Sequence, residues 1–132
     1  MTISRIDPDS LPPAVGYSQA TVAEGTRIVH VAGQVGITPD GTVVGPDHRS
    51  QLEQALRNLK LALEAAGATA GDVAKVTFYV VDYGPEVLGA LFEATAAVFG
   101  SEPPTSAATL VGVAALVDPE YKVEVEATAI LT

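Results

Sequence analysis

Two glutamates near the C-terminus have a spacing that could serve hydrolysis. Glu124 and Glu126 alternate with Val123, Val125 and Ala127, so a strand through this segment would place both carboxylates on one side. A positioned carboxylate can act as a general base when burial raises its pKa toward neutrality. The alternative is a solvated strand face, which is the interpretation that we favour for Glu126.

Tyr17 and Gly33 could supply polar contacts to a bound molecule. Tyr17 lies in the segment Gly16-Tyr17-Ser18-Gln19-Ala20 and carries a hydroxyl, although it could equally be a half-buried aromatic that anchors the chain. Gly33 permits close approach to its backbone, and its amide could face a carboxylate or carbonyl oxygen. Alternatively, Gly33 permits a β-bulge. We interpret the nearby His30 as a packed strand histidine rather than a catalytic one.

Composition excludes several classes of function. The chain has 132 residues, a formal net charge of −9 and only seven Lys and Arg, which disfavours a nucleic-acid partner. It has no cysteine and two distant histidines, so we expect no metal site. No glycine-rich phosphate loop is present, so we expect any activity to be cofactor-free. Because no apolar run resembles a membrane span or a leader, we expect a cytoplasmic protein with no membrane partner.

The N-terminal half predicts an arm, two strands and a helix. The first fifteen residues are rich in Pro and Asp and are predicted to cross the surface, and residues 18–23 and 27–32 are predicted strands. A helix should begin near Asp47 or Ser50, since both are good N-caps, and end at Gly67. Its apolar stripe comprises Leu52, Ala55, Leu56, Leu59, Leu63 and Ala66.

The C-terminal half predicts a strand, a second helix and two more strands. Val73 to Val81 is almost entirely apolar, which predicts a strand buried on both faces. Pro85 suits the first turn of a helix that ends at Gly100. The apolar positions of this helix are Leu88, Leu91, Phe92, Ala96 and Phe99. Residues 105–115 and 122–131 are the last two predicted strands.

These elements predict an α/β fold, specifically a two-layer α+β sandwich in which two helices cover one face of a mixed sheet. Residues 1–132 should form one domain. The sheet carries more apolar and small residues than two helices can cover. We therefore expect an oligomer that buries the opposite face.

Five segments together resemble the YjgF/RidA family of small trimeric proteins. They are residues 16–20, 31–34, 103–106 (Pro103-Pro104-Thr105-Ser106), 109–113 and 123–129, and their order and spacing match over almost the whole chain. The resemblance implies a chorismate-mutase-like fold and a homotrimer whose inter-subunit clefts bind a small-molecule metabolite. It also places the Tyr17 hydroxyl in the cleft and makes Glu124 the acid that positions the hydrolytic water.

The sequence departs from the family pattern at the loop before residue 107. Imine-hydrolysing relatives carry an arginine there that binds the substrate carboxylate, whereas this chain has Thr105 and Ser106. No arginine follows Arg57, so Arg27 and Arg49 are the substitutes that we consider.

Two other positions also differ from the family pattern. The family's Ser-Gly-Gln is Ala32-Gly33-Gln34 here, and Gly89 stands near where many relatives have an asparagine. Both changes remove a polar contact from the cleft that the resemblance implies.

The sequence thus predicts inter-subunit clefts that bind, and in the enzymatic interpretation hydrolyse, a small imine-, enamine- or carbonyl-type metabolite. The expected site comprises Glu124 as the catalytic residue and Tyr17, Ala32, Gly33, Thr105 and Ser106 as substrate-binding residues. Because Thr105 replaces the arginine, ordinary 2-imino-acid deaminase activity is disfavoured. The alternatives are an active 2-iminobutanoate/2-iminopropanoate deaminase with a substitute anchor, and a non-catalytic metabolite-binding protein.

Overall fold

A four-stranded mixed sheet carries Glu124, whereas Thr105 and Ser106 lie in the loop that leads into one of its strands. The computed structural model describes residues 3–132, so the first two residues of the predicted 1–132 domain lie outside it. The strand order is β3-β6-β4-β5, in which β4 and β5 are parallel and the other neighbours are antiparallel. The elements in chain order are β1 (Ile3–Ile6), β2 (Ala20–Ala23), β3 (Arg27–Val35), α1 (His48–Ala65), β4 (Val73–Val81), α2 (Glu86–Phe99), β5 (Ala107–Val113) and β6 (Val123–Leu131), with a 3₁₀ turn at Ala70–Asp72.

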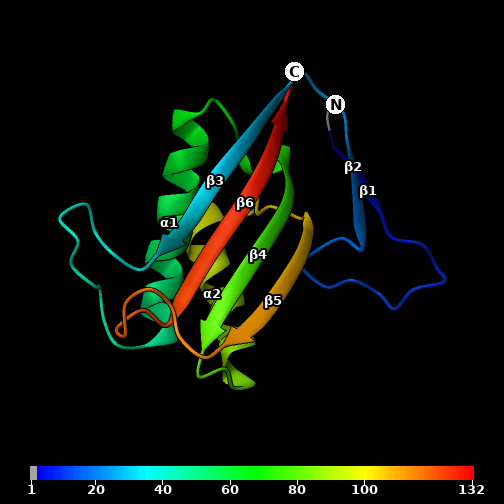
Figure 1. Cartoon of the computed structure of the whole chain (residues 1–132). Coiled ribbons are helices and arrows are strands. Elements are labelled where there is room, and N and C mark those ends of the chain that lie inside the picture. The colour runs from blue at the N-terminus through cyan, green and yellow to red at the C-terminus, as the bar shows by residue number, and fades with distance from the viewer. Residues whose placement is uncertain (1–2) are drawn as a thin grey trace.

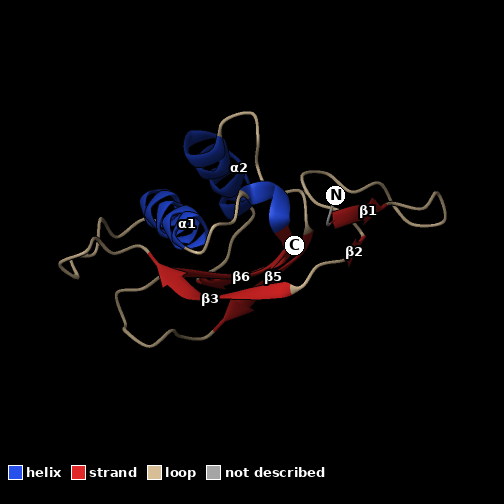
Figure 2. Cartoon of the chain, turned by 90° about the horizontal axis from the view of Figure 1, so that it is seen from above, coloured by secondary structure: helices blue, strands red, loops and turns tan. Residues whose placement is uncertain are grey.

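The two long helices lie together on one face of this sheet (Figure 2). The prediction of a two-layer α+β sandwich is therefore confirmed. Residues of β6 alternate strictly: Val123, Val125 and Ala129 are buried against the helices, whereas Glu124 and Glu126 lie on the opposite face. We call this opposite face the open face of the sheet.

Helix α1 begins and ends as its sequence indicates. Asp47 is the N-cap, and its carboxylate accepts a hydrogen bond of 2.8 Å from Ser50 N, so the alternative cap at Ser50 was wrong. Gly67 follows the helix with a φ of +83°, the left-handed conformation that glycine tolerates best. The predicted stripe is buried from Leu52 to Leu63, but Ala66 is exposed.

Helix α2 differs from the prediction in which residues it buries. Val87, Ala94 and Val98 face the core, whereas Leu88 and Phe92 are 44% and 45% exposed. The pattern identified an apolar face correctly, but part of that face borders a cavity rather than the sheet.

Strand β4 was predicted to be buried on both faces, but in the single chain only one of its faces is buried. Its buried residues alternate with half-buried or exposed ones, so only the helix-facing side is covered. The apolar residues of the other side lie on the open face.

The N-terminal arm contains a strand that the sequence did not predict. Residues 3–6 pair antiparallel with β2 and form a two-stranded sheet of their own. The strand was not predicted because it is only four residues long and lies in a Pro- and Asp-rich segment. The hairpin lies beyond β5, at the side of the sheet (Figure 1). The hydrogen bonds that hold it there include one from Thr21 Oγ1 to Ala74 O at 2.7 Å and one from Ser18 N to Ser106 O at 3.0 Å.

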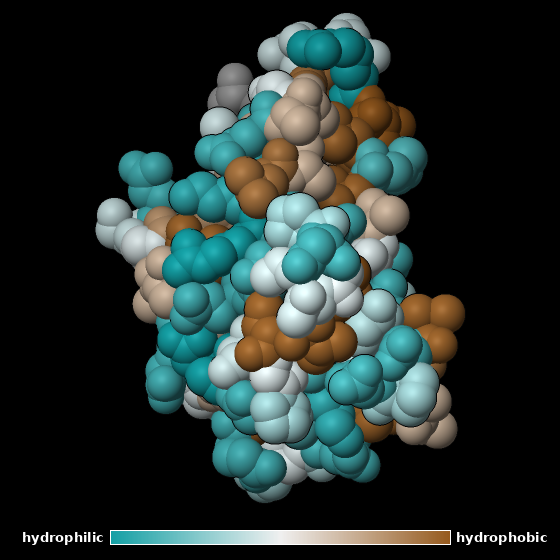
Figure 3. Space-filling view, turned by 90° about the vertical axis from the view of Figure 1, so that its left-hand side faces the viewer, coloured by the Kyte–Doolittle hydropathy of each residue, from teal (hydrophilic) through white to brown (hydrophobic). Residues whose placement is uncertain are grey.

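The side of the molecule that lies on the left in Figure 1 is mainly hydrophilic, and its apolar side chains form separate groups (Figure 3). Among residues 3–132, no helix combines the length and the hydropathy that crossing a bilayer requires.

Candidate functional site

Glu124 and Gly33 lie against each other across neighbouring strands. Strand β6 places Glu124 opposite Val35 of β3 and Tyr79 of β4. The pairing of β3 with β6 slips between Val31 and Gln34, so the β-bulge predicted at Gly33 is confirmed. A Cβ atom at Gly33 would lie 2.6 Å from Glu124 Cδ and closer still to Oε2. The half-buried Glu124 carboxylate therefore occupies the space that the missing side chain leaves over the bulge.

Polar side chains continue along the open face from Glu124. Tyr79 Oη donates to Glu126 Oε1 at 2.9 Å, and this hydrogen bond is the main reason why the pKa of Tyr79 is raised. The phenol is therefore a protonated donor at neutral pH. Lys75 Nζ donates to Thr109 Oγ1 at 2.7 Å, and His30 and Ala32 are exposed beside them.

The loop before β5 brings Thr105 next to an arginine that was not among the predicted substitutes. Arg5 Nε, from β1, donates to Thr105 O at 3.1 Å, and Ser18 Oγ donates to the same carbonyl oxygen at 2.8 Å. Arg5 is exposed, and no described residue accepts a hydrogen bond from its two Nη atoms. A guanidinium is therefore present beside the loop at which the family resemblance implies an arginine.

Within one chain, the two arginines named as substitutes lie away from this loop and have other partners. Arg49 forms ion pairs with Glu53 at 2.8 Å and with Glu93 at 3.5 Å. Arg27 donates to the backbone of Thr132 at 3.4 Å, at the far end of β3.

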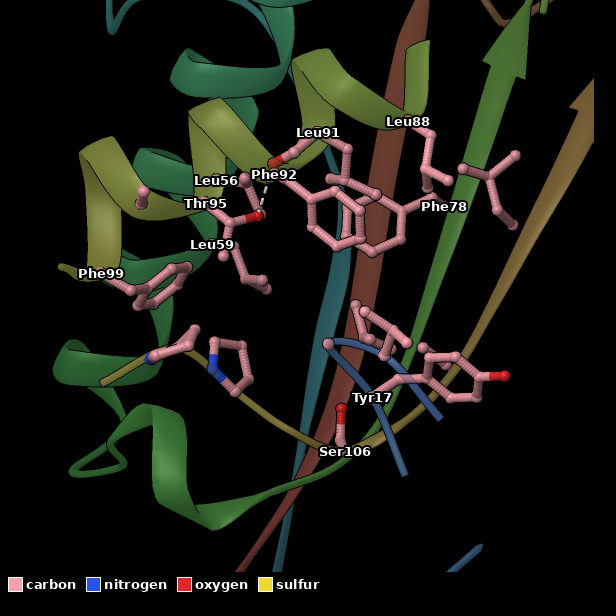
Figure 4. Close-up of a pocket in the computed structure, with 18 of the residues that line it drawn as sticks. Tyr17, Leu56, Leu59, Phe78, Leu88, Leu91, Phe92, Thr95, Phe99 and Ser106 are labelled. Carbon is pink, nitrogen blue, oxygen red and sulfur yellow. Dashed lines mark hydrogen bonds between the residues drawn. The ribbon is translucent and has the colours of Figure 1, made fainter. Parts of the chain in front are cut away.

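Ser106 and Tyr17 border a cavity of about 580 Å³ between α2, the start of β5 and the arm (Figure 4). Ser106 is 1% exposed, and its hydroxyl is buried without a hydrogen-bond partner among residues 3–132. Tyr17 is 37% exposed, and its hydroxyl points away from the cavity. The two residues therefore border the same space while their hydroxyl groups face different surroundings.

Within one chain, the predicted site residues form two separate groups. Tyr17, Thr105 and Ser106 gather at the start of β5, whereas Ala32, Gly33 and Glu124 gather where β6 begins. On β4, Lys75 pairs with Ala107 at the start of β5, and Tyr79 pairs with Glu124 of β6. The four residues from Lys75 to Tyr79 therefore separate the two groups by roughly 13 Å along the strands. Two inter-strand spacings of about 4.8 Å separate them sideways. Strand β6 begins at the lower end of the sheet and β5 begins higher, at the edge (Figure 1).

Sequence reasoning missed Arg5 because nothing local distinguishes it from other surface arginines. What distinguishes it is a hydrogen bond to a residue one hundred positions away. The one usable signal is its place beside Ile3, whose burial fixes the strand that carries both residues.

Comparisons with known proteins agree on one family. The sequence profile described as Endoribonuclease L-PSP matches residues 8–131. A RutC family protein of Pyrococcus horikoshii is 35% identical over 92% of each chain. The 2-iminobutanoate/2-iminopropanoate deaminase of Salmonella typhimurium is 32% identical over 92% of this chain and 93% of its own. A crystal structure of a Rid family protein of unknown function from Yersinia pestis superposes with a TM-score of 0.90, at 39% identity, over 99% of this chain and 100% of its own.

Proposed function

The chain belongs to the YjgF/RidA family, and we propose that it is a cofactor-free deaminase of small 2-imino acids that works in clefts between subunits of a homotrimer. The proposed reaction is hydrolysis: water adds to the carbon of the C=N bond, the resulting carbinolamine loses ammonia, and a 2-keto acid remains. Relatives named as deaminases cover nearly the whole chain, which supports this reaction class.

The observation that carries the proposal is the contact between Arg5 and Thr105. A substrate carboxylate needs a cation, and the loss of arginine at position 105 argued against such a substrate. Arg5 Nε is bound to Thr105 O at 3.1 Å, which orients the guanidinium and leaves its Nη edge for an anion. In this proposal the Arg5 guanidinium binds the substrate carboxylate, so the substrate class is an imine with a carboxylate on the adjacent carbon.

Glu124 is proposed to position and deprotonate the attacking water. Its carboxylate lies over the bulge at Gly33, so a water held by the carboxylate would also be close to backbone groups of residues 32 and 33. An amide donor near a reacting carbonyl or imine can stabilise the charge that develops during addition. Tyr17 is assigned to orient the ligand, since its hydroxyl points away from the chain's own cavity.

A second copy of the chain is required because one chain keeps these groups apart. Arg5 and Thr105 lie at the start of β5, and Glu124 lies at the start of β6. If the open faces of neighbouring copies meet, the start of β5 from one copy can approach Glu124 of the next. This arrangement would also cover the apolar side chains of the open face.

The test is hydrolysis of freshly generated 2-iminobutanoate by the wild type, Glu124→Gln and the matched variant Glu126→Gln. We expect Glu124→Gln to lower kcat by about 10²- to 10⁴-fold, the usual contribution of a positioned general base. Glu126 is bound to Tyr79 and should tolerate the change within about threefold. Equal rates for Glu124→Gln and the wild type would remove Glu124 from the mechanism.

A further inference from the structure

Glu124 is the middle one of three charged side chains that follow one another along the open face. Lys122 directly precedes β6 and Glu126 lies within it, so alternate positions carry Lys, Glu and Glu. Side chains two residues apart on one strand face are roughly 7 Å apart. The Lys122 ammonium could therefore reach the Glu124 carboxylate, and the Glu126 carboxylate could repel it. Either contact would interfere with a water molecule held by Glu124.

Both charged neighbours of Glu124 are bound sideways, to residues of β4 and of its end. Lys122 Nζ donates to Asp82 Oδ2 at 2.7 Å, and Tyr79 Oη donates to Glu126 Oε1 at 2.9 Å. Neither side chain is therefore directed along β6 toward Glu124. Among residues 3–132, no hydrogen bond or ion pair engages the Glu124 carboxylate itself.

Asp82 has an unusual backbone conformation. Its φ is +54°, in the left-handed region that aspartate and asparagine enter more readily than most other residues. Such a conformation persists where the surrounding structure determines it, and it often accompanies a functional contact. Here it directly follows β4 and accompanies the ion pair with Lys122. The hydrogen bond from Lys122 is the main reason why the pKa of the Asp82 carboxyl is lowered, so the pair is charged at neutral pH.

We propose that Tyr79 and Asp82 are positioning residues for Glu124. Tyr79 holds the Glu126 carboxylate away from Glu124, and it does so from β4. Asp82 holds the Lys122 ammonium away from the other side. The Glu124 carboxylate is then left to bind the attacking water over the bulge. The consequence for catalysis rests on the proposed deaminase function, whereas the effect of the two contacts on Glu124 can be measured without a substrate.

Other titratable side chains near this row are more distant or have partners of their own; they are His30, Lys75 and His48. His30 and Lys75 are level with a position four residues farther along β6 than Glu124. His48 lies near Asp82, and its Nε2 donates to Val81 O at 2.7 Å. Strand β3 places the uncharged Val35 opposite Glu124. Within one chain, the two flanking side chains of β6 therefore supply the nearest charges.

The test is a ¹³C NMR titration of the glutamate side-chain carboxyl groups, in which Glu124→Gln identifies the signal of Glu124. In Tyr79→Phe the released Glu126 carboxylate disfavours a second negative charge, so the Glu124 titration midpoint should move to higher pH. In Asp82→Asn the Lys122 ammonium loses its anionic partner, so the midpoint should move to lower pH. Asparagine tolerates the left-handed conformation, which preserves the backbone. Each shift should be about 0.5 pH unit, the scale of one charge at roughly 7 Å in water.

Removing the released charge as well should reverse each shift. The midpoint should therefore move back toward the wild-type value in the double variants Tyr79→Phe/Glu126→Gln and Asp82→Asn/Lys122→Gln. A change of fold or packing would not be reversed in this way. Tyr83→Phe is the control, because it removes a hydroxyl from an exposed tyrosine beyond the end of β4 and should leave the midpoint unchanged.

Turnover of 2-iminobutanoate on the same preparations separates this inference from the proposed function. The acidic limb of the pH profile of kcat/KM should move in the same opposite directions in Tyr79→Phe and Asp82→Asn. Midpoints that stay unchanged, or that move in one direction in both variants, would overturn the inference whether or not the wild type is active. Opposite shifts in a protein without turnover would support these contacts and contradict the proposed function alone.

Discussion

At position 33 the backbone accommodates the carboxylate of Glu124 in place of a side chain of its own. A Cβ atom there would meet the far end of the glutamate, which is flexible and can swing away. A methyl group should therefore move the carboxylate rather than unfold the strand. A substitution at Gly33 can therefore distinguish the proposed role in catalysis from a role in folding.

Gly33→Ala is predicted to impair activity with little loss of stability. Displacing a catalytic group by about 1 Å can cost roughly 100-fold in rate, so kcat for 2-iminobutanoate should fall by about that factor. The thermal midpoint should stay within a few degrees of the wild type. Gly71→Ala is the control, because a Cβ there meets only Thr69 Oγ1 at an ordinary 3.7 Å. A large drop in the thermal midpoint with normal kcat would show that Gly33 serves folding alone.

Part of the candidate site could be predicted residue by residue, and part could not. The bulge at Gly33 and the shared face of Glu124 and Glu126 follow from period-two alternation and from the freedom of glycine. Arg5 could not be predicted, because hydrogen bonds between distant segments leave no periodic signal in the sequence. Likewise, the pattern placed Ser106 in the loop before β5, but it could not tell that packing leaves this side chain only 1% exposed.

At the scale of elements, Gln51 shows what binary patterning misses. The helical pattern groups it with the polar face of α1, yet it is 0% exposed. Its Nε2 donates to Gly45 O at 2.8 Å and Glu120 O at 3.0 Å, and its Oε1 accepts from Lys122 N at 2.7 Å. One side-chain amide thus joins the start of α1 to the loop before β6.

Gln51→Ala is predicted to destabilise the fold strongly. It would leave two carbonyl groups and one N–H of the backbone without their partner, so we expect a loss of about 3 kcal/mol in the free energy of unfolding. Gln54→Ala breaks only a partly buried contact with Asn58 and should cost about 0.5 kcal/mol. Urea unfolding at a single protein concentration measures both. Similar losses for the two variants would contradict the structural role of Gln51.

Strands and helices with clear caps were predicted closely, and the arm was not. Strand β4 was predicted over the observed residues, and the bounds of α1 and α2 follow from Asp47, Gly67, Pro85 and Gly100. Strand β1 is four residues long and has one buried residue, Ile3, so it offers too few positions for alternation to be recognised. Its partner is set by tertiary packing rather than by a local turn.

At the scale of the whole molecule, the open face is the main unpartnered surface that the sheet presents. It combines apolar residues such as Ile28, which is 63% exposed, and Val111, which is 39% exposed, with the glutamates of β6. The separation of Arg5 from Glu124 within one chain gives a second reason to expect that copies meet on this face. The net charge of −9 disfavours a nucleic-acid substrate, despite the description of the matching family profile.

Analytical ultracentrifugation should give a particle of three times the 13.5 kDa chain mass for the wild type. Val111→Arg, on the open face, should lower this mass, because each copy would bury an unpaired guanidinium in the proposed interface. Leu61→Arg is the matched control: Leu61 is 61% exposed on α1, away from the open face, and the trimer should persist. A single-chain mass for the wild type, or equal masses for both variants, would contradict the assembly that we propose.

The most direct test of the proposed function compares kcat/KM for 2-iminobutanoate in the wild type, Arg5→Gln, Arg27→Gln and the double variant Arg5→Gln/Thr105→Arg. We expect turnover by the wild type and at least a thirtyfold loss in Arg5→Gln, the lower end of about 2–5 kcal/mol for removing one partner of a charge pair. Arg27→Gln should retain activity, and arginine restored at position 105 should rescue the double variant. Turnover that is absent in the wild type, or unchanged in Arg5→Gln, would contradict the role of Arg5 as the carboxylate anchor.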